Sequence, residues 1–106
     1  GRGGYASDFD VETYFLHDVP AEVAAAGASQ QRAEAKVVFR EACRFKAWPK
    51  VPTHVIAGRD DRFFPLEFQR RVAHERLQLP VEELRGGHLI ALSNPYDLAE
   101  SLFSYL

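Results

Sequence analysis

Hydrophobic residues follow a helical period in the first half of this chain. Asp18-Val19-Pro20 is typical of a helix entry, and we expect a short helix over residues 21–26 that Gly27-Ala28-Ser29 breaks. From Ser29 to about Arg44, the apolar positions have the i, i+3, i+4, i+7 spacing of an amphipathic helix. These positions are Ala35, Val38, Phe39 and Ala42. Residues 8–46 are therefore predicted to be mostly helical.

The second half alternates strand and helix signals. A β-branched and apolar run over residues 53–57, ended by Gly58, predicts a buried strand. Pro65 opens a predicted helix that ends near residues 79–80, and residues 81–84 predict a second strand. Asn94-Pro95 is a good start for a last helix. Its apolar face would consist of Leu98, Ala99, Leu102, Phe103 and Leu106. This order predicts an α/β fold whose parallel strands are joined by a right-handed crossover.

The chain divides into three parts. Residues 1–7 are glycine-rich and predict a flexible lead-in, and residues 8–46 form the helical segment. Trp48-Pro49 and Val51-Pro52 make a rigid connection, because each proline disfavours helix in the residue before it. Residues 47–106 then carry the strand-helix-strand-helix unit. We find no internal repeat.

Composition and charge exclude several classes of partner. The chain has 106 residues, a formal net charge of -2 and an isoelectric point near 6.1. It therefore has no basic field for nucleic acid or an anionic membrane, and we expect neither partner. The single Cys43, for which we expect a packing role, cannot form an internal disulfide. With no apolar run of about 18 residues, these features predict a cytoplasmic protein.

Polar side chains with catalytic potential follow both predicted strands. Gly86-Gly87 lets the chain turn sharply and present His88, whose imidazole accepts and donates protons near neutral pH. The loop after the first strand contains two carboxylates, Asp60 and Asp61. Because ligands bind at the carboxyl ends of strands in open α/β sheets, we expect these loops to form one site. An isolated surface histidine often has no function. The loop with Asp60 and Asp61 is therefore what favours His88 as a catalytic base.

The order of these motifs resembles the carboxyl-terminal part of an α/β-hydrolase. The resemblance rests on Val51-Pro52 before a strand, Gly58-x-x-Asp61, Pro65, Gly86-Gly87-His88 and Asn94-Pro95. Residues 61–64 and 66–69 are similar to the small plant methylesterase and hydroxynitrile lyase group and its bacterial relatives. Residues 17–23 resemble the start of a helix in the cap of that group. The likeness covers residues 9–106.

The resemblance implies roles for particular residues. Asp61 would be the acid of a Ser-His-Asp triad and His88 the base, with Asp60 as the competing acid. Residues 8–46 would form the helical cap or lid, and residues 47–106 part of the hydrolase core. Four apolar residues would line the substrate pocket, with ordinary core packing as the alternative: Phe15, Phe63, Phe64 and Leu89. No metal or cofactor is expected. Among the other histidines we expect His54 within a strand, His74 on a helix, and only His17 near a ligand.

Two departures from the family pattern limit this prediction. The family's nucleophile lies in a Gly-x-Ser-x-Gly elbow that also builds the oxyanion hole, and this chain has no such motif. None of its serines has that setting: Ser7, Ser29, Ser93, Ser101 and Ser104. The lyases of the group usually carry lysine after the histidine, where this chain has Leu89, so ester hydrolysis is favoured over cyanohydrin cleavage.

We therefore expect a fragment of a serine esterase, inactive alone, that acts on a small apolar ester in the intact protein. The absence of methionine and the start at Gly1-Arg2-Gly3-Gly4 favour a fragment or a processed product. Two strands cannot make the sheet of such a fold, so the missing amino-terminal half or a second copy would cover the open edges. The alternatives are a non-catalytic interaction or structural module, and a lyase or cofactor-free oxygenase on the same fold.

Overall fold

The structure is a computed structural model that describes residues 9–106. Its centre is a two-stranded parallel sheet of β1 (Val55–Gly58) and β2 (Val81–Leu84), paired from Val55↔Val81 to Gly58↔Leu84. The predicted lead-in, residues 1–7, lies outside the described residues. The chain is therefore α/β in the general sense expected from its sequence.

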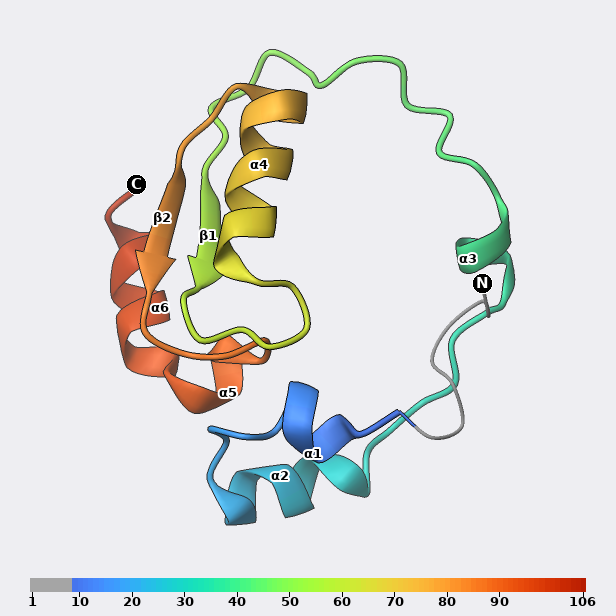
Figure 1. Cartoon of the computed structure of the whole chain (residues 1–106), viewed down its shortest axis with the longest axis vertical. Helices are drawn as coiled ribbons and strands as arrows, with labels where there is room; N and C mark the ends of the chain where they lie inside the picture. Colours follow the sequence, from blue (N-terminus) through green and yellow to red (C-terminus); the bar gives the residue numbers. More distant parts are fainter. Residues whose placement is uncertain (1–8) are drawn as a thin grey trace.

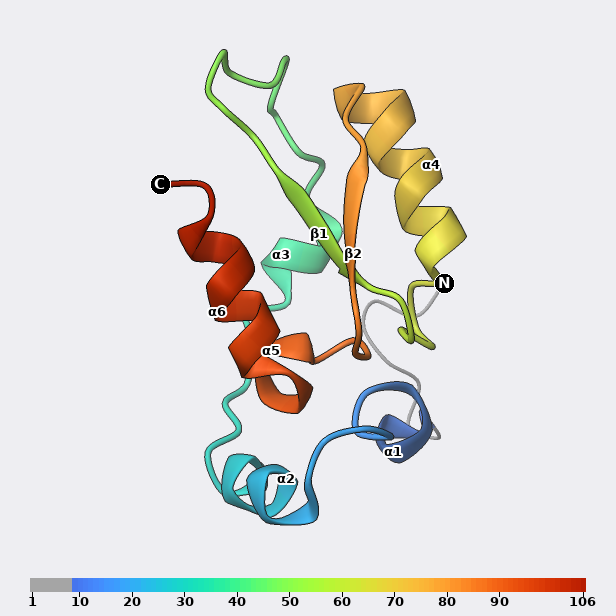
Figure 2. The ribbon, with the colours of Figure 1, turned by 90° about the vertical axis from the view of Figure 1, so that its left-hand side faces the viewer.

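Helices cover both faces of this sheet (Figure 2). Helix α4 (Leu66–Leu77) joins the strands and packs on one face, and α6 (Pro95–Phe103) lies on the other. Helix α4 ends where Gln78 adopts a left-handed conformation with φ 55° and its N–H bonds to carbonyls of the last turn. As predicted, Asn94 caps α6, because its side chain accepts a hydrogen bond from Asp97 N. The short helix α5 (Ile90–Ser93), which we did not predict, precedes it.

The amino-terminal segment, residues 9–28, lies beneath the carboxyl ends of the strands (Figure 1). It contains α1 (Val11–Tyr14), which we did not predict, and α2 (Ala21–Ala28). The helix predicted over residues 21–26 forms and continues to Ala28, and it ends at Ser29, within the stretch predicted to break it. A Cβ at Gly27 would meet nothing within 4 Å, so this glycine faces open space.

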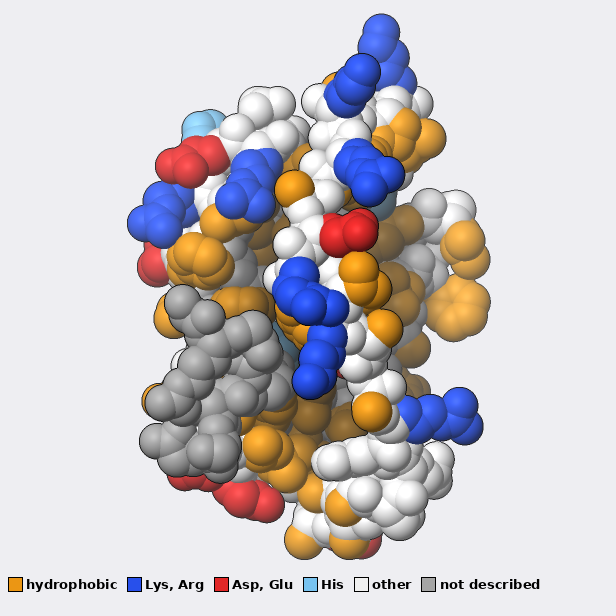
Figure 3. Space-filling view, turned by 90° about the vertical axis from the view of Figure 1, so that its right-hand side faces the viewer, with side chains coloured by type: hydrophobic (Ala, Val, Ile, Leu, Met, Phe, Trp, Pro, Cys, Tyr) orange, Lys and Arg blue, Asp and Glu red, His pale blue; other side chains and the backbone are white. Residues whose placement is uncertain are grey.

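The predicted helix over residues 29–44 is wrong, and so is the prediction that residues 8–46 are mostly helical. Only α3 (Val37–Arg40) forms, in a long connecting segment (Figure 1). Every residue from 25 to 52 is exposed, and Figure 3 faces the side of the molecule on which this segment lies. An amphipathic helix gains most of its stability by burying its apolar face, and this segment finds no surface to bury it on. Phe39 is 57% exposed, and Cys43 is exposed rather than packed.

The core of the described residues is small. Its buried hydrophobic residues are Val19, Ala57 and Ala73, and no large side chain is fully buried. The apolar face predicted for the last helix is largely uncovered, since Phe103 is 72% exposed and Leu106 97%. The described residues therefore leave much of their apolar surface uncovered. None of the described helices has the length and apolar character needed to cross a membrane.

Candidate active site

The loops that follow β1 and β2 bring His88 and Asp61 together. His88 Nδ1 lies 3.0 Å from Asp61 Oδ2, and the two side chains are 22% and 5% exposed. The parallel register causes this meeting, because it places the carboxyl ends of both strands at the same edge. No described residue forms a hydrogen bond with the other ring nitrogen, Nε2. Asp61 thus orients the imidazole through Nδ1 and leaves Nε2 available for proton transfer.

Asp61 is held by its own loop. Its Oδ1 accepts hydrogen bonds from the backbone N–H groups of Phe63 and Phe64, both at 2.8 Å. Its Oδ2 accepts a longer bond from Gln69 Nε2, at 3.3 Å. Three donors besides the imidazole therefore fix the position of the carboxylate. Gln69 was not singled out in the sequence, because its role depends on the turn of α4 that brings it back to the loop.

Asp60, the competing acid, is turned away from the imidazole. Its Oδ2 accepts a hydrogen bond from Gly86 N at 3.1 Å, and Arg59 Nε lies 3.5 Å from the same oxygen. The backbone N–H of Asp60 in turn donates to Gly86 O at 2.9 Å. Asp60 thus fastens the loop after β1 to the loop that carries His88. Asp61 alone of the two carboxylates reaches the imidazole.

Glycines allow these two loops to lie in contact. A Cβ built at Gly58 would come within 2.5 Å of Gly87 O and closer still to Gly86 O, which real Cβ atoms do not do. Gly86 itself has φ +139°, a conformation that residues with side chains rarely adopt. The glycines before His88 therefore serve the close approach of two backbones as well as the sharp turn.

Aromatic rings enclose the imidazole of His88. Phe15 stacks on it with ring centroids 4.6 Å apart and planes at 12°. Phe63 and Phe64 meet it edge-on, at centroid distances of 5.3 and 5.4 Å. Three of the four residues predicted to bind substrate thus touch the candidate base and hold its ring. Leu89, the fourth, is half-buried at the start of α5.

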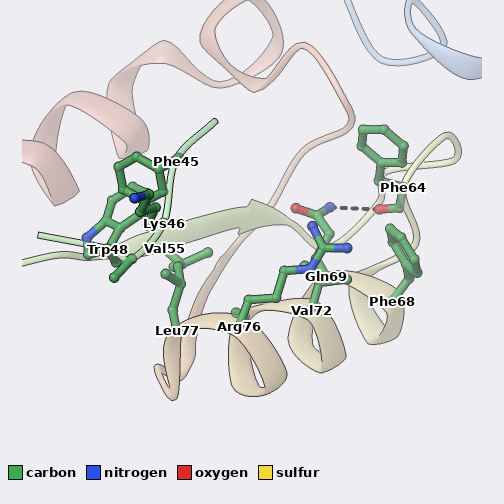
Figure 4. Close-up of a pocket in the computed structure, with 12 residues that line it drawn as sticks. Phe45, Lys46, Trp48, Val55, Phe64, Phe68, Gln69, Val72, Arg76 and Leu77 are labelled. Atoms are coloured by element: carbon green, nitrogen blue, oxygen red, sulfur yellow. Dashed lines mark hydrogen bonds between the residues drawn. The ribbon is translucent and has the colours of Figure 1, made fainter. Parts of the chain in front are cut away.

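An apolar pocket adjoins this pair through Phe64 and Gln69 (Figure 4). It has a volume of about 750 Å³ and lies between α4, β1 and the connecting segment before β1. Gln69 Nε2 donates to Phe64 O at 2.7 Å, so a residue that holds Asp61 also fixes the pocket wall. Apolar groups that line it include Phe45, Trp48, Val55, Phe68, Val72 and Leu77. The sequence singled out only Phe64 of these lining residues.

The remaining histidines lie in three different settings. His54 precedes β1, so its predicted place within a strand is wrong; it is exposed and stacks on Tyr105 with ring centroids 3.8 Å apart. His74 is exposed on α4, as expected. His17 is half-buried beside Gly87. Over residues 9–106, no group of three or more His, Cys, Asp or Glu side chains is arranged to hold a metal ion.

The described serines do not pair with His88. The hydroxyl of Ser101 donates to Glu82 at 2.6 Å, and that of Ser104 to Ser101 O at 2.6 Å. Ser29 bonds to its own helix, and Ser93 Oγ is buried without a hydrogen-bond partner among the described residues. The described residues thus hold a histidine–aspartate pair that has no serine hydroxyl hydrogen-bonded to it. Comparison with protein-family models, with curated proteins and with solved structures finds no match for this chain.

Proposed function

We propose that this chain supplies the base and the acid of a Ser-His-Asp triad in an esterase, and that residues 47–106 are part of an α/β-hydrolase core. The observation that carries the proposal is the 3.0 Å contact between His88 Nδ1 and Asp61 Oδ2. In a triad the carboxylate fixes the tautomer with the proton on Nδ1, so that Nε2 is the base. The rings of Phe15, Phe63 and Phe64 contact the imidazole and cover part of it, which leaves the His88 side chain 22% exposed.

The reaction proceeds in two half-reactions. His88 Nε2 takes the proton of the serine hydroxyl as its oxygen attacks the ester carbonyl, and Asp61 stabilises the imidazolium that forms. The imidazolium then gives this proton to the departing alkoxide, leaving an acyl-enzyme and an alcohol. In the second half, Nε2 takes a proton from water as the water oxygen attacks the acyl group. The proton returns to serine, and the carboxylic acid leaves.

In this proposal a second polypeptide segment supplies the serine and the oxyanion hole. The amino-terminal half of a longer protein is the first candidate, and another copy of this chain is the second. The uncovered apolar side chains of α6 and of residues 29–52 support such a partner, because exposed apolar surface is stabilised when it is covered. The second edge of β1 also has backbone groups available for pairing. The single Cys43 is compatible with a reducing cytosol, which we propose as the location.

The proposed substrate is a small ester with apolar groups. Its reacting carbonyl would approach Nε2 of His88, and an apolar group would enter the pocket past Phe64. A volume of about 750 Å³ is within the range of small-molecule sites, and mostly apolar walls favour apolar groups. Lyase or cofactor-free oxygenase chemistry would use the same histidine, so substrates of those classes are the comparison set for the assay below.

The test is hydrolysis of short apolar esters by the protein at its natural length. We expect His88→Ala to lower kcat by a factor on the order of 10⁴ or more, because the base of the triad is lost. His74→Ala is the matched control, since His74 is exposed on α4, and it should leave kcat unchanged. A folded protein without ester hydrolysis, or with equal kcat in the His88 variant, would refute the esterase proposal. The former result would favour a non-catalytic interaction module.

A further inference from the structure

The loop that carries His88 is held by a residue far away in the sequence. Asp18 Oδ2 accepts a hydrogen bond of 2.7 Å from the backbone N–H of Gly87, the residue directly before His88. The two residues are 69 positions apart, and the bond joins segment 9–28 to the loop that follows β2. A bond from an N–H to a carboxylate is about twice as strong as one between neutral groups. Asp18 thus acts on the backbone that sets the direction of the imidazole.

His17 and Asp18 lie against Gly87 and leave no room for a side chain at that position. A Cβ at position 87 would lie 2.7 Å from His17 Nε2 and 2.8 Å from Asp18 Oδ1. Both of these atoms are buried without a hydrogen-bond partner among the described residues. A buried polar atom without a partner costs about 1–3 kcal/mol, so stability does not explain the arrangement. A role in placing the loop does explain why a histidine and a carboxylate lie against a glycine.

A second contact from segment 9–28 holds the imidazole itself. Phe15 lies three residues before Asp18 and stacks on the His88 ring. The segment continues into residues 29–52, which are entirely exposed, so contacts at the loop rather than the connection determine where it lies (Figure 1). Arg62 adds one such contact, because its guanidinium donates to Thr13 O at 3.4 Å. Segment 9–28 thus contacts both the loop after β1 and the loop that carries His88.

We propose that Asp18 is a positioning residue for His88, and that it couples the docking of segment 9–28 to the assembly of the acid–base pair. The proposal rests on the function proposed above. Gly86 and Gly87 have no side chains that could fix their own backbone; Asp60 holds Gly86, and Asp18 holds Gly87, the residue directly before His88. Without it the imidazole rotates away from Asp61, and a misplacement of about 1 Å can lower a rate by about 10².

The test compares Asp18→Ala and Asp18→Asn in the natural-length protein. Asparagine retains an oxygen that can accept the hydrogen bond from Gly87 N, and alanine does not. We expect Asp18→Ala to lower kcat by about 10² with KM changed less than about twofold, and Asp18→Asn to recover most of that loss. Glu22→Ala is the control, since Glu22 is an exposed carboxylate in the first turn of α2. Equal kcat in the alanine variant and the wild type would overturn the proposal.

A spectroscopic measurement separates this proposal from the esterase proposal. Long-range ¹H–¹⁵N spectra report which ring nitrogen of His88 carries the proton, whether or not the protein hydrolyses esters. We expect the Nδ1–H tautomer in the wild type and in Asp18→Asn, and a mixture of tautomers in Asp18→Ala. If Asp18→Ala changes the tautomer of His88 in a protein that does not hydrolyse esters, the positioning role of Asp18 is supported and only the esterase proposal is refuted. If the protein hydrolyses esters and Asp18→Ala does not change the His88 spectrum, the positioning role is refuted and the esterase proposal stands.

If Asp18→Ala does not fold, hydrogen exchange in the wild type decides the question. The Gly87 amide is expected to exchange slowly, because its proton is bonded to a half-buried carboxylate. Asp18→Asn should keep this amide protected. Rapid exchange of the Gly87 amide in the folded wild type would mean that the bond does not hold the loop, and would overturn the proposal.

Discussion

Replacing Gly58 with alanine would push the two site loops apart. Gly58 is the last residue of β1, and its Cα faces the backbone of the loop that carries His88. A Cβ there would lie 2.5 Å from Gly87 O, whereas ordinary contacts begin at 3.4 Å. Gly86 O would lie closer still, so the backbones must separate by at least about 0.9 Å to accept one methyl group. The two oxygens, those of Gly86 and Gly87, belong to the backbone, so a rotamer change cannot relieve the strain.

This displacement has two measurable consequences. Overpacking of this kind costs about 1–3 kcal/mol of unfolding free energy. Because the displaced loop leads directly to His88, a shift of about 1 Å should also lower kcat by about 10². The assays are chemical denaturation and ester hydrolysis, both on the natural-length protein.

The matched control is Gly27→Ala. Gly27 lies inside α2, where a Cβ meets nothing within 4 Å, so alanine should stabilise the helix by about 0.5–1 kcal/mol and leave kcat unchanged. If Gly58→Ala kept both the wild-type stability and the wild-type kcat, the close contact between the loops would not determine the position of His88.

Three further changes test other parts of the structure. Asp61→Asn should lower kcat by a factor on the order of 10⁴ in steady-state assays, because an amide can favour the wrong tautomer of His88; a loss of less than tenfold would contradict this. Asn94→Ala removes the cap of α6 and should cost about 1 kcal/mol in a urea titration, and an unchanged midpoint would refute the cap. The hydrogen bond that Tyr105 donates to Glu82 raises the pKa of its phenol above the ordinary 10.0. This bond stabilises the fold below pH 10.0 and is lost as the pH rises through the raised pKa; phenolate absorbance should show one late-titrating tyrosine that Glu82→Gln removes.

The unit from β1 to α6 could be predicted from sequence because its signals are local. Gly58, Pro65 and Asn94-Pro95 mark the ends and starts of elements through their own backbone preferences. The helix predicted between Ser29 and Arg44 failed because its apolar stripe needs a tertiary partner, which a spacing rule does not consider. The apolar side chains of α6 are exposed for the same reason, because no described element packs on that face. Local patterns identify the apolar face of a helix, and the rest of the fold decides whether that face is buried.

The site was predictable as far as it follows from topology. Loops after parallel neighbours meet, so Asp61 and His88 could be paired before their contact was seen. The Gly58-x-x-Asp61 motif already favoured Asp61 over Asp60, and in the structure Asp61 contacts the imidazole while Asp60 bonds to Gly86. Asp18 could not be identified at all, because its bond to Gly87 spans 69 positions and follows no periodic pattern.

The most direct test of the proposed base is the rate at which a fluorophosphonate labels the natural-length protein. This probe reacts with a serine hydroxyl only where a base activates it. We predict rapid labelling of one serine, a loss of labelling in His88→Ala, and normal labelling in His74→Ala. Labelling at the same rate with alanine in place of His88, or no labelling of the folded wild-type protein, would contradict the claim that His88 and Asp61 serve a serine nucleophile.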